Sequence, residues 1–148
     1  IKMNYFLLFL GYIGFYSPPP LNKWIARIKG VNFEDIKSTW IGIGTFFDNK
    51  NPSDIYIGKN VTISNKVTIL THSEPPESMR KFGIYYFESP VFIGSNVYIG
   101  ANTTILPGIR INNNCIIGAS SVVTKDVESF SIVAGNPAKK IKELKRIS

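Results

Sequence analysis

The sequence predicts a mainly β protein, a solenoid of short parallel strands, and three observations support this. Branched aliphatic residues recur every six positions, with polar or small residues between them. The period keeps its phase across an interruption, because four periods separate Ile69 from Ile93. Residues that tolerate tight turns follow the aliphatic residues at a constant distance. The repeated positions are Ile57, Ile63, Ile69, Ile93, Ile99, Ile105, Ile111, Ile117 and Val123.

Each six-residue unit is expected to form one strand and one corner. The position two before each repeated residue is also apolar or small, so buried and outward positions alternate as in a half-buried strand. Stacked coils with a short fixed period share one apolar interior, whereas a period of six does not fit one face of an α-helix. Glycine follows the repeated residue in several units, where its missing Cβ lets the backbone bend closely. These glycines are Gly58, Gly94, Gly100 and Gly118.

Three parts are expected along the chain. Residues 1–38 form an N-terminal segment with an apolar run, Tyr5–Tyr16, and a basic amphipathic stretch, Leu21–Lys29. Residues 39–135 form the β-helix, from which residues 73–90 leave as an extended loop. Residues 136–148 form a basic C-terminal helix or tail that covers the open end of the coils. The apolar run is shorter than the ~20 residues needed to cross a bilayer, so a helix packed on the first coil or on a neighbouring subunit is expected. Light attachment to a membrane surface is the alternative.

Composition narrows the classes of function. A chain of 148 residues with 44% hydrophobic residues suits one compact domain. Its single cysteine, Cys115, occupies an inward position and cannot form an internal disulfide, so a cytoplasmic protein is expected, either free or peripheral to the inner face of the membrane. The net charge of +7 invites a nucleic-acid partner, but the lysines crowd the C-terminus and no RNA-binding motif or helix-turn-helix pattern is present. A small phosphate-rich ligand or a solvated surface explains this charge better.

The only histidine, His72, lies at a corner position, so its ring is expected to project outward. The loop 73–90 follows it at once and contains three prolines and the aromatic group Tyr85, Tyr86 and Phe87. Long loops in compact folds are often functional, and an imidazole accepts a proton from an alcohol near neutral pH. His72 is therefore a candidate general base, and an ordinary surface histidine is the alternative. One histidine cannot supply the three ligands of a β-helical zinc enzyme, so no metal is expected.

The stretches 55–72, 90–108 and 115–144 resemble the hexapeptide-repeat acyltransferases, most of all their maltose, galactoside and polysaccharide O-acetyltransferase branch. The resemblance implies a left-handed parallel β-helix with three hexads per coil. It also implies a homotrimer with active sites between subunits and acetyl-CoA as co-substrate. His72 then deprotonates the acceptor hydroxyl, with Asp48 preferred over Asp54 as its partner, and either aspartate can instead contact the acceptor.

The same resemblance assigns further site residues. Tyr85 and Tyr86 could present an aromatic face to a sugar ring, or pack the loop down. Small residues leave the backbone accessible to pantetheine, and lysines suit the nucleotide phosphates. The residues implied for acetyl-CoA binding are Ala101, Ala119, Thr124, Lys125, Lys139 and Lys142.

The function expected is transfer of acetyl from acetyl-CoA to a sugar hydroxyl, in polysaccharide or glycan biosynthesis. Alternatives with the same donor and base are acetylation of an amino-sugar nitrogen, of serine or of an antibiotic hydroxyl. A β-helical scaffold without catalysis is the alternative of a different class.

Overall fold

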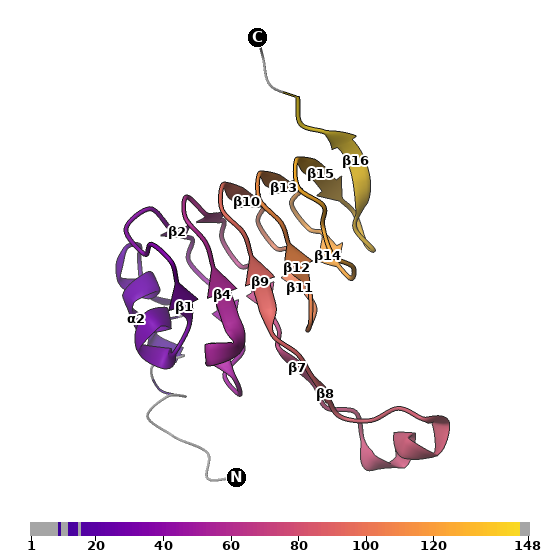
Figure 1. Ribbon diagram of the computed structural model, residues 1–148. Coiled ribbons are helices and arrows are strands. Elements are labelled where there is room, and N and C mark those ends of the chain that lie inside the picture. The colour runs from indigo at the N-terminus through magenta and orange to yellow at the C-terminus, as the bar shows by residue number, and fades with distance from the viewer. Residues whose placement is uncertain (1–8, 10–11, 15, 146–148) are drawn as a thin grey trace.

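The body of the molecule is a three-sided parallel β-helix (Figure 1), seen in a computed structural model that describes residues 9, 12–14 and 16–145. The first face contains β1 (Asn32–Phe33), β4 (Ile55–Ile57), β9 (Val91–Ile93) and β12 (Arg110–Ile111), in that order. The second contains β2 (Trp40–Ile41), β5 (Thr62–Ile63), β10 (Val97–Ile99), β13 (Cys115–Ile117) and β15 (Ser131–Ala134), followed by β16 (Lys139–Glu143). The third contains β3 (Phe46–Phe47), β6 (Thr68–Ile69), β11 (Thr104–Ile105) and β14 (Val122–Val123). Three parallel faces are consistent with the left-handed β-helix implied by the resemblance.

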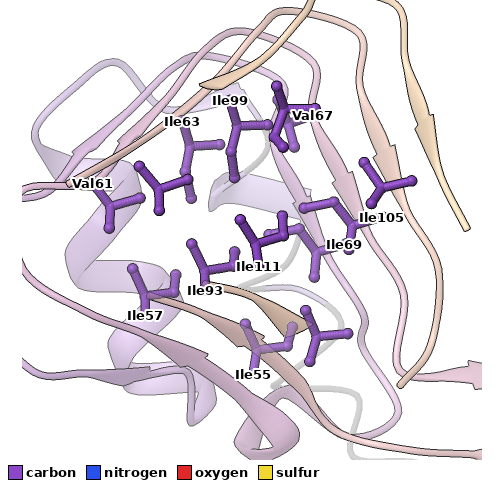
Figure 2. Close-up of a cluster of buried hydrophobic side chains, with 14 of the residues drawn as sticks. Ile55, Ile57, Val61, Ile63, Val67, Ile69, Ile93, Ile99, Ile105 and Ile111 are labelled. Carbon is purple, nitrogen blue, oxygen red and sulfur yellow. The ribbon is translucent and has the colours of Figure 1, made fainter. Parts of the chain in front are cut away.

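The repeated aliphatic residues stack in columns because each strand pairs in register with its equivalent in the next coil. Ile57 pairs with Ile93, and Ile93 with Ile111. The same register joins Ile63, Ile99 and Ile117 on the second face, and Ile69, Ile105 and Val123 on the third. These side chains are at most 3% exposed and fill the interior (Figure 2). Burying each contributes about 1.5–3 kcal/mol, so the period itself accounts for the core.

In most units the chain turns at the position that the sequence predicts. Six polar residues at the expected corner positions have φ between 54° and 59°, the left-handed conformation that lets the chain turn sharply. The glycines before them permit close stacking. A Cβ on Gly100 would lie 2.5 Å from the backbone nitrogen of Ala119 in the next coil. The six corner residues are Asn60, Lys66, Asn96, Asn102, Asn114 and Ser120.

Helix α2 (Leu21–Lys29) packs against the first coil, which begins at β1, ahead of the expected start at residue 39. The Asn22 side chain donates hydrogen bonds to the carbonyls of Ile41 (2.7 Å) and Gly42 (3.3 Å). The helix ends at Gly30, whose φ of 117° only glycine adopts readily. Most of the apolar run 5–16 lies outside the described residues. Within the described part of the chain, no helix is long and apolar enough to cross a membrane.

The expected C-terminal helix is wrong. Residues Lys139–Glu143 form β16, which pairs antiparallel with β15 on the second face. The last coil leaves one edge of β15 with unpaired backbone groups, and the chain reverses at Gly135 (φ 104°) to cover that edge. Lysines on β16 then discourage pairing with further strands, which explains the basic composition of this segment without a helix.

The extended loop is a hairpin arm that projects from the body (Figure 1). It consists of β7 (His72–Ser73), the 3₁₀ segment η2 (Glu77–Phe82) and β8 (Phe87–Glu88), with β7 and β8 antiparallel. The Ser89 N–H donates to the Thr71 carbonyl at 2.9 Å, so the chain leaves and re-enters the coil at the same corner. This closure explains why the interruption does not shift the period.

Candidate active site

His72 and Asp48 meet at one corner because their strands are neighbours. Asp48 follows β3 and His72 closely follows β6, and these strands pair with Phe47 opposite Ile69. The His72 Nδ1–H donates a hydrogen bond of 2.6 Å to Asp48 Oδ2. The His72 side chain is 24% exposed and lies outside the apolar interior, as its sequence position predicts. Unlike the corner asparagines, His72 does not have a positive φ, since it begins the arm.

Asp48 is buried and firmly held. Its carboxylate accepts hydrogen bonds from the backbone N–H of Thr71 (2.8 Å) and of Lys50 (3.0 Å), besides the bond from His72. Burial by itself would raise the pKa of Asp48, but the bonds from Lys50, Thr71 and His72 outweigh it and lower the pKa below its usual value. The carboxylate is therefore ionised at neutral pH. It retains the proton on His72 Nδ1 and leaves Nε2 free to accept one.

The root of the arm is attached to the body beside this pair. The Lys50 ammonium lies 3.1 Å from Glu74 Oε2 and 4.4 Å from the centre of the Tyr86 ring. Asn51 donates to Glu88 Oε2 at 3.0 Å, and the Tyr86 hydroxyl donates to the same oxygen. The Tyr86 ring centre is 6.3 Å from that of His72. A charged and polar network that includes Tyr86 thus lies beside the imidazole.

Sequence reasoning missed Lys50, Asn51 and Glu88. Only one signal could have found any of them: if residues 72 and 88 are the two ends of a hairpin, Glu88 lies opposite His72, as it does here. Asp54 ends the 3₁₀ segment Pro52–Asp54 and is half-buried, and the histidine pairs with Asp48 instead. Tyr85 is 62% exposed on the arm, next to the more closely held Tyr86.

Known proteins are similar to this chain both in the hexapeptide repeats and in the overall fold. Residues 90–125 match the family described as bacterial transferase hexapeptide (six repeats). The chain is 41% identical over 91 residues to the galactoside O-acetyltransferase of Escherichia coli K12, covering 61% of this chain and 44% of that protein. A galactoside O-acetyltransferase of Lactococcus lactis is 41% identical over 86 residues, 57% of this chain and 41% of that protein. The chain therefore spans less than half the length of these relatives.

Solved structures extend the similarity to nearly the whole chain. A maltose O-acetyltransferase from Clostridium difficile 630 superposes with a TM-score of 0.73 and 27% identity, covering 98% of this chain and 88% of that one. In its repeats and in its fold, the chain is similar to the hexapeptide-repeat acetyltransferases. A galactoside acetyltransferase solved in complex with coenzyme A has a TM-score of 0.68 and 25% identity, over 97% of this chain and 82% of that one.

In this hexapeptide-repeat chain, the residues implied for donor binding lie away from His72. Ala101 and Ala119 occupy equivalent corners of adjacent coils, bridged by the Ser120 N–H, which donates to the Ala101 carbonyl at 2.8 Å. These corners lead into the third face, whereas His72 follows the end of a strand of that face. Thr124 directly follows β14. Lys125 lines a hollow of about 320 Å³ together with Lys139 and Lys140, while Lys142 belongs to the same strand, β16.

Two other chemistries find no support among the residues described. No group of three or more His, Cys, Asp or Glu side chains there could hold a metal ion. Cys115 is buried in the core, and burial raises the pKa of its thiol, which disfavours the nucleophilic thiolate.

Proposed function

We propose that this chain is an acetyl-CoA-dependent O-acetyltransferase that acts on a sugar hydroxyl, with His72 as general base. The observation that carries the proposal is the 2.6 Å bond between His72 Nδ1 and the buried, ionised Asp48. An imidazole fixed in this way presents Nε2 as its basic atom beside an arm that offers hydrogen-bonding groups. The E. coli and C. difficile relatives are named as acetyltransferases of galactosides and maltose, which supports both donor and acceptor class.

The reaction requires no covalent enzyme intermediate. His72 Nε2 takes the proton of the acceptor hydroxyl as its oxygen forms a bond to the thioester carbonyl carbon. The resulting tetrahedral intermediate collapses with cleavage of the carbon–sulfur bond. The leaving thiolate receives the proton from the imidazolium, so the products are an acetyl ester and free coenzyme A. Asp48 holds the ring in place and stabilises the imidazolium through its negative charge.

The site requires a neighbouring subunit. The strands of the third face all run in one direction, from the corners of Ala101 and Ala119 toward the edge at which His72 lies. The width of this face therefore separates the donor corners from the base within one protomer. If the third face is turned toward a threefold axis, the His72 edge of one copy meets the alanine edge of the next. This arrangement yields a homotrimer with three sites between subunits.

The surroundings of His72 favour a neutral, polyhydroxyl acceptor. Lys50, Glu74 and Glu88 supply both positive and negative hydrogen-bonding groups within one exposed network. Tyr86 adds an aromatic ring, and Tyr85 stands exposed beside it on the arm. Sugars combine apolar ring faces with hydroxyls, so they suit both kinds of group.

The test is release of free thiol from acetyl-CoA with a panel of acceptors: galactosides, maltose, oligosaccharides, an amino sugar, serine and an antibiotic alcohol. Saturable release with a sugar hydroxyl is expected, and His72→Ala should lower the rate by about 10²–10⁴-fold. Thr62→Ala, on the outer surface of the second face, is the matched control and should retain the rate. A fully active His72→Ala protein would disprove the base assignment. Release only with the amino sugar or serine would show that the acceptor is not a sugar hydroxyl. Absence of both thiol release and a thermal shift with coenzyme A would favour a scaffold without catalysis.

A further inference from the structure

Helix α2 is unusual in burying two polar residues while it exposes three large apolar ones. Its face toward the first coil contains the polar residues Asn22 and Lys29 beside Ile25 and Ala26. Asn22 is satisfied by the carbonyls of Ile41 and Gly42, and Lys29 donates to Asn49 Oδ1 (2.5 Å) and to the Phe47 carbonyl (3.4 Å). Helices on the surface of a globular protein normally turn polar residues outward. Here the polar residues are used to attach the helix, and the outward face requires a separate explanation.

That outward face is apolar. Leu21, Trp24 and Ile28 follow one another at intervals of three and four residues, which places them on one side of the helix, and they are 50%, 45% and 63% exposed. Aromatic residues just before the helix are exposed as well: Phe9 by 58%, Tyr12 by 68% and Tyr16 by 64%. We call these six side chains the N-terminal apolar patch. A helix face that exposes Leu21, Trp24 and Ile28 together marks an interaction surface more often than isolated exposed residues do.

The charged residues of helix α2 are all positive. Helix α2 contains no acidic residue, Arg27 is exposed, and Lys23 is half-buried where its ammonium donates to the Thr39 carbonyl at 2.9 Å. A twofold contact between copies through this face would bring the Arg27 side chains of the two molecules close together, which opposes a dimer through the patch. Anionic lipid headgroups, in contrast, complement both cations, and tryptophan and tyrosine favour the boundary between headgroups and acyl chains.

We infer that the N-terminal apolar patch docks this enzyme on the surface of an anionic lipid bilayer. Helix α2 lies in the plane of the surface, with Trp24 and Ile28 at the depth of the acyl boundary and Arg27 among the headgroups. The helix is part of the end of the coil stack opposite β16 (Figure 1), so docking there leaves the sides of the β-helix and the arm open to solvent.

The proposed trimer strengthens this binding, and this step rests on the proposed function. Coils packed side by side around a threefold axis place three copies of α2 at the same end of the assembly. Three weak contacts then act together on one surface, with an avidity well above that of one helix.

Co-sedimentation of the full chain with lipid vesicles tests the inference without any need for acetyl transfer, so its failure is distinguishable from failure of the proposed activity. Binding is expected to vesicles that contain phosphatidylglycerol and to be much weaker with phosphatidylcholine alone. The double variant Trp24→Ser/Ile28→Ser should lose about tenfold or more in apparent affinity. The matched control is Phe82→Ser, which removes a 66% exposed apolar side chain from the tip of the arm and should bind like the wild type.

Fluorescence supplies the second measurement. The chain contains two tryptophans, so Trp40→Phe leaves Trp24 as the only tryptophan, which is excited selectively at wavelengths that tyrosine does not absorb. Its emission should shift to the blue on addition of anionic vesicles. Absence of binding and of the shift would overturn the inference, as would equal binding by the Ser double variant. Dissociation of the oligomer by that variant, measured by light scattering, would show that a second copy covers the patch instead.

Discussion

Replacing Asp48 by asparagine separates the charge of the pair from its geometry. Asp48 Oδ2 accepts bonds from both Thr71 N–H and His72, whereas Oδ1 accepts one from Lys50 N–H. The asparagine carbonyl oxygen therefore best occupies the place of Oδ2, where it serves two donors. His72 then keeps its proton on Nδ1 and stays in position, but the negative charge that stabilises the imidazolium is lost.

The size of the effect follows from the hydrogen bonds. A bond to a charged group contributes about 1.5–3 kcal/mol and a neutral one about 0.5–1.5, so the imidazolium loses roughly 1–2 kcal/mol. Since about 1.36 kcal/mol corresponds to a tenfold change in rate, kcat/KM should fall by roughly 5- to 30-fold in Asp48→Asn. This is less than the loss expected for His72→Ala. Asp48→Ala also frees the His72 ring to rotate, so its loss of kcat/KM should lie between those of Asp48→Asn and His72→Ala.

The assay is thiol release from acetyl-CoA with the best acceptor from the panel, combined with circular dichroism to verify that each variant is folded. Asp48→Asn with an unchanged rate would show that the carboxylate is structural only. An Asp48→Asn loss as large as that of His72→Ala would show that the asparagine side chain rotates and reverses the tautomer, which would refute the reasoning from the two donors.

Three further predictions concern charge and packing. The fold lowers the pKa of Asp48, so its ionisation stabilises the folded protein. The stabilisation is complete at pH values above the unfolded pKa of ~3.9 and is lost as the pH falls through the lower pKa of the folded state. The Tm difference between wild type and Asp48→Asn should accordingly shrink from neutral pH toward pH ~3. Burial lowers the pKa of Lys29, while its ammonium interacts favourably with Asp48. Lys29→Met should therefore raise the pKa of Asp48, measured by NMR titration of its carboxyl carbon, whereas Lys23→Met, on the same helix, should leave that pKa unchanged. An Asp48 pKa that does not respond to Lys29→Met would contradict this interaction. Gly100→Ala places a Cβ 2.5 Å from the Ala119 backbone nitrogen and should lower the free energy of unfolding by about 1–3 kcal/mol, measured with denaturant. A variant as stable as the wild type would contradict the close stacking of the coils.

The β-helix was predictable because its information is periodic. Every sixth residue reports the same environment, so burial, corners and register follow from counting, and the stacking of Ile57, Ile93 and Ile111 agrees with that count. The C-terminal segment has no such period. Residues 139–143 became a strand because β15 presents an open edge, and that edge is a property of the folded coils. Local composition could not reveal it.

The candidate site, too, was predictable from the sequence only in part. His72 was singled out by its corner position, and Asp48 was named as its partner through the resemblance. The register that brings the two side chains together joins β3 to β6 across an irregular spacing. Lys50, Asn51 and Glu88 join the site only because the arm folds back on its own root. Contacts of this kind depend on the path of a loop, which follows no repeat.

The closure of the arm at Thr71 and Ser89 has an evolutionary consequence. Because both ends of the insertion lie at one corner, its length and sequence can change while the coils above and below keep their pairing. Lineages could exchange or remodel this appendage as a cassette, acquiring new substrates on an unaltered scaffold. Grafting arms between related enzymes offers a direct route to redesigned selectivity.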